Sequence, residues 1–297
     1  MTTAAHGGAI IREGLEAFRV KERSRARRAI IHHRAHLGPV RRPSARARWH
    51  PLGCHRARIP DRLVFDTLVQ VLVFGCAYAR IADATCSATT LRRRRDEWIA
   101  AGVIDAVQTL ALAAYDRMIG LVVDDVAIDC WITKAPCGGE VAGRSPVDRG
   151  KLGLKRSVAV DAAGIPLATI TAPANRHDSP LLEPNLDALE IVARPLTVHL
   201  DRGYDSEATR TRLATRGLTA AIAAKGKPAP VTAGQRWVVE RTNAWSNAHK
   251  TLVWCTERRA VVIAFWIAFS AAIIIVGRLV RQAWTRCRWE TRPRRRP

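Results

Sequence analysis

Several common signatures are absent from this chain of 297 residues. Its seven cysteines include no Cys-x-x-Cys pair, which argues against a zinc ribbon, and their odd number argues against a closed disulfide framework. We therefore expect reduced thiols and a cytoplasmic, nucleoid-associated protein. The first 35 residues contain Arg and His but no continuous apolar run, so a secretory signal is not expected.

Acidic residues are scarce, with 26 Asp and Glu against 48 Lys and Arg, and the formal net charge is +22. The excess lies at the two ends: residues 1–60 hold 14 Arg and Lys against three Glu, and residues 277–297 hold eight Arg against one Glu. The intervening residues are nearly balanced. This distribution indicates polyanion-binding arms on a globular body. A coding bias toward Arg and Ala is the alternative, and we favour nucleic acid.

A nucleotide-binding loop is also missing. The stretch GRSPVDRGK over 143–151 is followed by Leu152, where the Walker pattern requires Ser or Thr, and it has Ser145 where that pattern requires Gly. No ATP is therefore expected. Arg149, Lys151 and Lys155 are instead predicted to contact DNA phosphates, with solvated loop charges as the alternative.

Only one long apolar run is present. Residues 260–276, AVVIAFWIAFSAAIIIV, contain no charge over 17 positions, which is the lower limit for a membrane span. A buried helix that closes a core has the same periodicity. Because the run is single, we favour the buried helix and expect no membrane partner, with a membrane-anchored basic protein as the alternative.

The segment 61–121 has a helical pattern. Gly75 and Gly102 mark helix ends, and Ser87 is a plausible N-cap. A helix, a tight polar turn and a second helix fit a helix-turn-helix. We therefore predict that the arginine run on the second helix binds DNA, although such a run is often only a solvated face. The expected helices cover 61–74, 77–82, 88–101 and 103–121, and the run is Arg92, Arg93, Arg94 and Arg95.

From residue 122 the pattern becomes rich in strands. Three consecutive strands are followed by an alternation of helices and strands, which predicts an α/β fold with a mixed sheet flanked by helices. A ribonuclease H-like fold has this order. The expected strands lie at 126–132, within 154–172 as a hairpin turning at 162–164, at 195–201 and at 218–224; helices are expected from 179, over 206–217 and over 236–254.

Three carboxylates stand where such a sheet would bring them together. Asp129 is expected to end the first strand, Asp201 ends the fourth, and Glu240 lies on the helix after the fifth. Close carboxylates repel unless they share a proton or a divalent metal. Two Mg²⁺ ions there could drive an in-line displacement at phosphorus. Asp124 and Asp125 compete with Asp129 but precede the strand, and Asp205 more simply starts the next helix.

The chain also resembles the DDE transposases of bacterial insertion sequences. The residues that carry the resemblance are Asp129 with CWITKAPCGG, SPVDRGKLGLKRSVAVDAAGIPL, ANRHDSPLL, LDRGYDS and RWVVERTNAW. The spacings of 72 and 39 residues between Asp129, Asp201 and Glu240 resemble the branch without an inserted β domain. The resemblance implies cleavage at element ends and strand transfer, with Mg²⁺ or Mn²⁺ held by the three acids. It also implies terminal-repeat and target DNA as partners and a homodimer.

Further residues and boundaries follow from the same pattern. Asn175, His177 and Asp178 are expected either to support the metal ligands or to serve only in a turn and a helix cap. Arg241 and Lys250 are expected to contact DNA, although Ala248 stands where relatives often carry Arg. A non-catalytic DNA-binding protein or an inactive transposase remnant is the alternative function. The expected parts are a basic arm over 1–60, a helical DNA-binding region over 61–121, a catalytic domain over 122–280 and an Arg-rich tail over 281–297.

Overall fold

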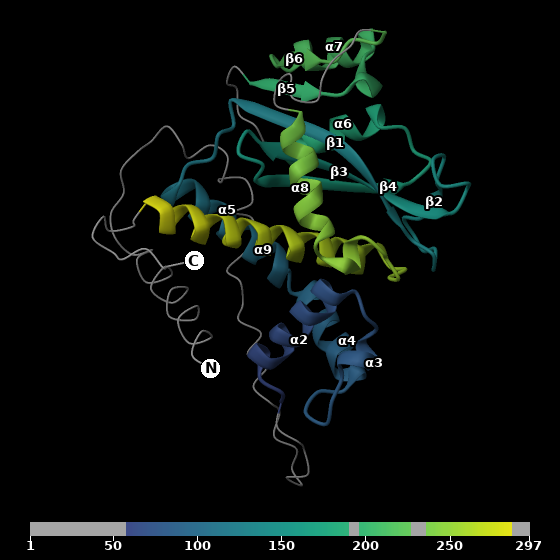
Figure 1. Cartoon of the computed structure of the whole chain (residues 1–297), viewed down its shortest axis with the longest axis vertical. Helices are drawn as coiled ribbons and strands as arrows, with labels where there is room; N and C mark the ends of the chain where they lie inside the picture. Colours follow the sequence, from purple (N-terminus) through teal and green to yellow (C-terminus); the bar gives the residue numbers. More distant parts are fainter. Residues whose placement is uncertain (1–57, 190–195, 227–235, 287–297) are drawn as a thin grey trace, which may run out of the picture.

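The computed structural model describes residues 58–189, 196–226 and 236–286 (Figure 1). Most of the expected basic arm and Arg-rich tail lies outside these ranges. The helices are α2 (Asp61–Phe74), α3 (Tyr78–Ile81), α4 (Ala88–Ala100), α5 (Val103–Met118), α6 (Ser179–Ala188), α7 (Glu207–Thr215), α8 (Trp237–Asn247) and α9 (Ala260–Arg286). The strands are β1 (Asp125–Lys134), β2 (Gly143–Arg144), β3 (Leu152–Asp161), β4 (Pro166–Pro173), β5 (Thr197–Leu200) and β6 (Thr219–Ile222).

One mixed sheet organises the chain from residue 122 onward. β4, β3 and β1 are antiparallel neighbours, and β5 and β6 continue the sheet in parallel with β1. The short β2 pairs with the start of β3 and was not expected. The order β4-β3-β1-β5-β6, with helices in the parallel connections, is that of a ribonuclease H-like sheet. The predicted fold class is therefore confirmed.

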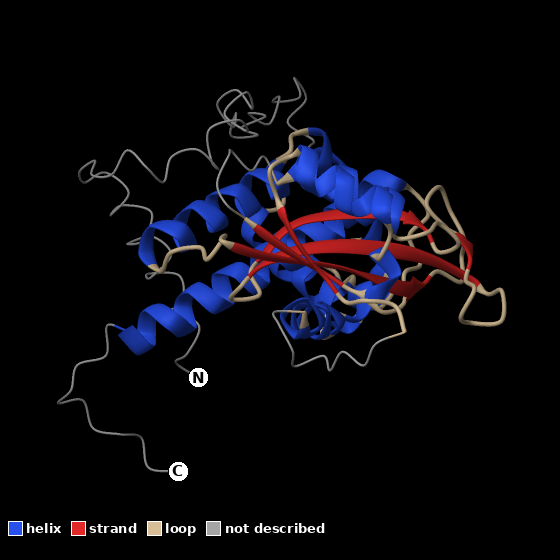
Figure 2. Ribbon diagram, turned by 90° about the horizontal axis from the view of Figure 1, so that it is seen from above, coloured by secondary structure: helices blue, strands red, loops and turns tan. Residues whose placement is uncertain are grey.

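Helices cover both faces of the sheet (Figure 2). Because side chains alternate along a strand, neighbouring β1 residues face opposite layers. Val126 and Ile128 pack with Leu182 and Leu186 of α6, whereas Ala127 packs with residues of α8. The alternation therefore assigns the odd-numbered positions of β1 to the face that α8 covers.

The helices of the 61–121 region do not form a core of their own. Leu68 and Leu72 of α2 and Leu91 of α4 belong to one buried cluster with Phe265 and Phe269 of α9. On α9 the rings of Phe265 and Trp266 meet edge to face, with centroids 5.1 Å apart, and Trp266 and Phe269 are stacked at 6.2 Å. α9 therefore joins the helical region to the sheet.

The apolar segment 260–276 is the first part of α9. Within the described ranges, α9 alone is long and apolar enough to cross a membrane, and the bent pair α4–α5 would qualify only if it were one span. In an apolar window of 18 residues along this helix, 61% of the window is buried inside the protein, and α5 packs along the helix (Figure 1). This is the placement of a core helix, as favoured from the sequence.

Most helix ends lie where the sequence places them. Gly75 ends α2 in the left-handed conformation, and the Ser87 hydroxyl accepts a hydrogen bond from the Thr90 amide. The helix expected over 236–254 was wrong in its second half, because α8 ends at Asn247. His249 is held by Ser270 of α9, and Thr251 donates to the Val71 carbonyl. These tertiary contacts replace the last helical turns.

Candidate active site

The register of two strands brings Asp129 and Asp201 together. Parallel β1 and β5 pair Val126 with Val198 and Ala127 with His199, an offset of 72 residues that equals the spacing from Asp129 to Asp201. The same offset, continued two residues further, sets the two aspartates opposite each other. Neighbouring strands lie about 4.8 Å apart, so the carboxylates start from adjacent positions on the α8 face.

Asp129 was expected to end the first strand, but it lies in the middle of β1. β1 continues to Lys134 because β3 pairs with it along that whole stretch, up to Lys134 opposite Gly153. The strand that ends at the site is β5, at Leu200. Asp201 follows immediately, and its Oδ1 accepts a hydrogen bond of 2.8 Å from the Gly203 amide. The site therefore lies where β5 stops beside a longer β1.

Glu240 reaches the same place from α8. Val238 and Val239 are buried against Ala127 and Val158 of the sheet, which fixes the first turn of α8 above β1 and β3. Glu240 follows directly and is exposed. One pocket is lined by residues from three elements and includes all three acids: Ile128, Asp129, His199, Asp201, Arg236, Val239 and Glu240.

The electrostatics of this pocket favour a cation. Burial, with a smaller contribution from the negative charges of Asp201 and Glu240, raises the pKa of Asp129 to about 7, although a 2.7 Å hydrogen bond from the Cys130 amide acts in the opposite direction. Asp129 thus carries a fraction of a proton at neutral pH when no cation is present. A bound cation would favour the ionised form.

The competing acids have other partners. Asp125 lies 2.7 Å from Nε2 of His199. Asp205 accepts hydrogen bonds from the Lys225 amide at 2.9 Å and from Arg210 at 2.6 Å, and these lower its pKa. Neither acid lines the pocket with Glu240.

Two comparisons with known proteins address the family. The family described as "Transposase DDE domain" matches residues 126–232, and a second family of the same description matches residues 198–277. A protein assigned as the transposase of insertion sequence element IS402 in Burkholderia cepacia is 36% identical over 153 residues, which is 48% of this chain and 72% of that protein. The chain belongs to the DDE transposases of bacterial insertion sequences.

Solved structures of similar proteins are more distant. The catalytic domain of the Mos1 mariner transposase is 12% identical, with 62% of this chain and 89% of that chain covered and a TM-score of 0.33. The Mos1 paired-end complex with the left transposon end is also 12% identical, with coverages of 79% and 82% and the same score. Because both scores are low, the assignment of this transposase rests on the family matches and on the relative.

The donor atoms of the pocket fit the divalent metal that this family requires. All three acids offer carboxylate oxygens, which hard cations such as Mg²⁺ and Mn²⁺ prefer. Among the described residues, no group of three His, Cys, Asp or Glu side chains is close enough to hold one ion together. This does not conflict with the fit, since Mg²⁺ is usually bound by one or two carboxylates together with substrate phosphates and water.

Sequence reasoning missed two residues of the transposase pocket, His199 and Arg236. His199 stands two positions before Asp201 on a strand, so alternation alone sets both on one face. Arg236 stands four positions before Glu240, at the start of the same helix. Strand alternation and helix spacing could therefore have predicted both residues once the strand and the helix had been identified.

The residues of the loop after β4 separate into two groups. Asp178 accepts from Nζ of Lys155, and its charge contributes to the raised pKa of Asp129. Asn175 and His177 line a different cavity beside Pro173 and Pro180. Of the three residues predicted to support the ligands, only Asp178 is electrostatically linked to an acid of the pocket.

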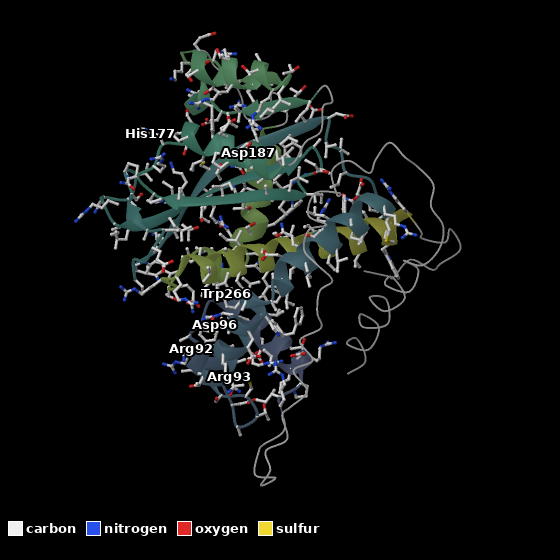
Figure 3. All side chains as sticks on the ribbon, turned by 180° about the vertical axis from the view of Figure 1, so that it is seen from behind. Arg92, Arg93, Asp96, His177, Asp187 and Trp266 are labelled. Atoms are coloured by element: carbon white, nitrogen blue, oxygen red, sulfur yellow. The ribbon has the colours of Figure 1, made fainter. Side chains whose placement is uncertain are left out.

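The arginine run on α4 is half buried. Arg92 and Arg93 are exposed at the end of the helical region far from the sheet (Figure 3). Arg94 is 1% exposed and pairs with Asp61 and with Glu97. Arg95 is 5% exposed and pairs with Glu257. Arg94 and Arg95 are therefore buried against carboxylates. Arg92 lies over the Tyr78 ring and Arg93 is 3.9 Å from Glu97, but both side chains are exposed and accessible to a phosphate.

The remaining predicted DNA contacts also differ in exposure. Lys155 is 7% exposed and held by Asp178 and the Arg176 carbonyl, 2.6 Å away. Arg241 lies between the rings of Trp237 and Trp245, 4.5 and 5.0 Å from their centroids, and donates to the Ala163 carbonyl. Both side chains therefore have structural partners. Three others remain exposed: Arg149, Lys151 and Lys250.

Proposed function

We propose that this transposase cleaves DNA at the ends of its element and joins the freed 3′-hydroxyl to target DNA, with Asp129, Asp201 and Glu240 as ligands of two Mg²⁺ or Mn²⁺ ions. The observation that carries this proposal is the single pocket lined by all three acids. A protein that only binds DNA has no need of three carboxylates gathered from β1, β5 and α8, and the family assignment does not favour that alternative.

The chain's own residues would prepare the site in two ways. β1 and β5 provide rigid mounts, because their backbones are paired on both sides up to the pocket. Glu240 is exposed at the first turn of α8, so its carboxylate can reach across the pocket without further burial. The two ions would activate the attacking oxygen and stabilise the leaving oxygen at phosphorus.

His199 and Arg236 complete the wall of the pocket. The hydrogen bond between His199 and Asp125 joins β5 to β1 a few residues before Asp201 and Asp129. We infer that it fixes the register that sets Asp201 opposite Asp129. Arg236 contributes a cation to the pocket from the N-cap position of α8. We infer that it attracts a DNA phosphate toward the acids, since a guanidinium matches phosphate geometry.

The DNA partner would meet the exposed cations. We propose that Arg92 and Arg93 of the helical region contact terminal-repeat DNA, and that Arg149, Lys151 and Lys250 contact phosphates near the acids. Helices over 61–121 would then act in recognition and residues 122–280 in catalysis, although α9 joins them through one core. Two DNA ends must be held together, so we propose a homodimer.

Cleavage of labelled DNA that carries the sequence flanking this gene tests the function. We expect nicking with Mg²⁺ and none with EDTA, and we expect Asp201→Ala to abolish nicking while DNA binding stays within about twofold. Asp205→Asn is the matched control, because Asp205 lies four residues away outside the pocket. Nicking that survives in Asp201→Ala would contradict the assignment of the ligands.

A further inference from the structure

Arg156 of β3 is a buried cation without an acidic partner. Its side chain is 2% exposed, and burial lowers its pKa to about 10, so it remains charged at neutral pH. Within the described residues no carboxylate forms an ion pair with it, and its Nε has no hydrogen-bond partner. A buried charge of this kind is costly unless something compensates it.

The compensating group is the end of α8. Nη2 of Arg156 donates a 2.7 Å hydrogen bond to Oδ1 of Asn247, which is the last residue of that helix. The carbonyl end of a helix carries a partial negative charge, so a cation there is stabilised. Arg156 thus interacts with the partial negative charge at the C-terminal end of α8 and also donates a hydrogen bond to its last residue.

The same helix carries Glu240. Residues seven apart lie on one face of an α-helix, two turns and about 10.5 Å from each other. The Arg156–Asn247 bond and the Glu240 carboxylate are therefore on the same side of α8. On β3, Arg156 lies two residues from Val158, the residue opposite Asp129. The Arg156–Asn247 bond and the acid pocket are therefore both located above the paired strands β1 and β3.

The first half of α8 has other attachments to the sheet. Val238 and Val239 are buried in a shared cluster, and Thr242 donates a 2.7 Å hydrogen bond to the Gly164 carbonyl. An isolated helix of 11 residues is marginal in water, so its second half also needs an attachment. The Arg156–Asn247 bond supplies one.

We propose that the Arg156–Asn247 hydrogen bond is a clamp that fixes the angle of α8 across β1 and β3 and thereby positions Glu240 over Asp129 and Asp201. Arg156 and Asn247 are positioning residues, because neither lines the pocket that contains the acids. The inference rests on the proposed role of Glu240 as a metal ligand.

Two measurements on the full chain test the clamp. Asn247→Ala removes the acceptor from a half-buried position, Asn247→Asp keeps an acceptor, and Ser246→Ala is the matched control one residue away. We expect Asn247→Ala to speed amide exchange over residues 240–247 about tenfold. We also expect it to slow nicking at saturating DNA and Mn²⁺ by about 10- to 100-fold, the range for residues that orient metal ligands.

The binding constant for DNA in EDTA separates positioning from a general loss of structure. We expect it to be unchanged in Asn247→Ala, and we expect Asn247→Asp to restore most of the nicking rate. Arg156→Lys combined with Asn247→Ala should lose no more activity than the worse single variant, because both changes break one interaction.

Several results would overturn the clamp. Unchanged exchange in α8, wild-type nicking in Asn247→Ala, or independent losses in the double variant would each do so. If the wild-type chain shows no metal-dependent nicking, the proposed function fails instead. Amide exchange over α8 still decides whether the Arg156–Asn247 bond holds the helix.

Discussion

Arg95 and Glu257 form an ion pair with 3.1 Å between Nη1 and Oε1, although 162 residues separate them in the chain. The same carboxylate oxygen accepts from the Tyr78 hydroxyl at 2.8 Å and from the Trp266 indole at 3.3 Å. Figure 3 shows Trp266 between the arginines of α4 and the sheet. The predicted DNA-recognition helix is thus fastened to the start of α9 by a buried polar cluster.

This cluster divides the arginine run by function. We predict that Arg92→Ala and Arg93→Ala weaken DNA binding, and that each reduces the slope of log binding constant against log salt by about one phosphate contact. Because their contacts with Tyr78 and Glu97 are at exposed positions, we expect each to lower the unfolding temperature less than Arg95→Ala does. We predict that Arg95→Ala destabilises the fold by about 3 kcal/mol, because Glu257 loses its cationic partner. Binding at several salt concentrations and thermal unfolding of each variant provide the comparison. Equal effects from Arg92 and Arg95 on binding, with no effect on stability, would contradict it.

Metal removal should lower the stability of the wild-type protein. A cation that binds only the folded chain at 100 times its dissociation constant adds about 2.7 kcal/mol to the free energy of unfolding. We expect Mn²⁺ to raise the unfolding temperature relative to EDTA, and Asp129→Asn with Asp201→Asn to remove the difference. Calorimetry of both proteins measures it. A rise of the same size in the double variant would show that the ion binds elsewhere.

Stability should fall in mild acid because of His249. Burial lowers its pKa below the ordinary value of 6.5, and Nδ1 lies 2.7 Å from the Ser270 hydroxyl. The unfolded chain therefore takes up a proton more readily than the folded one, so the stability that neutral His249 provides is complete above pH 6.5 and is lost as pH falls below it.

Chemical denaturation at pH 7.5 and pH 5.5 isolates this contribution. We expect the wild type to lose more stability than His249→Asn over that interval. His177→Asn, at an exposed position, is the control and should behave as the wild type does. An identical loss in His249→Asn would assign the acid sensitivity to other groups.

Two glycines with the same backbone conformation should differ in their tolerance of a side chain. Gly75 and Gly102 have φ of +63° and +62°. A Cβ at Gly75 would lie 2.7 Å from Cβ of Lys250, whereas nothing lies within 4 Å at Gly102. We expect Gly102→Ala to cost roughly 1 kcal/mol from strain alone, and Gly75→Ala to cost about 1 to 3 kcal/mol more from overpacking. Urea unfolding of both variants tests the difference, and equal costs would mean that the contact relaxes freely.

Local signals in the sequence predicted much of the fold. Capping by Ser87, the left-handed end at Gly75 and the turn before Gly164 depend on neighbouring residues only, and each lies where it was expected. The end of α8 at Asn247 did not follow from the sequence, because the contacts of His249 and Thr251 with α9 and α2 decide it. The burial of Arg94 and Arg95 beside the exposed Arg92 and Arg93 could not be predicted from the sequence for the same reason.

The sequence by itself determined the order of elements and the chemistry of the acids, since residue type, spacing and periodicity are local properties. It also contained the 72-residue spacing that sets Asp129 opposite Asp201. Only the tertiary structure decided which strand ends at the pocket and that Arg156 is held at the end of α8. The reason is physical: burial and pairing depend on which surfaces meet, and residues such as Arg95 and Glu257 meet only when the whole chain has folded.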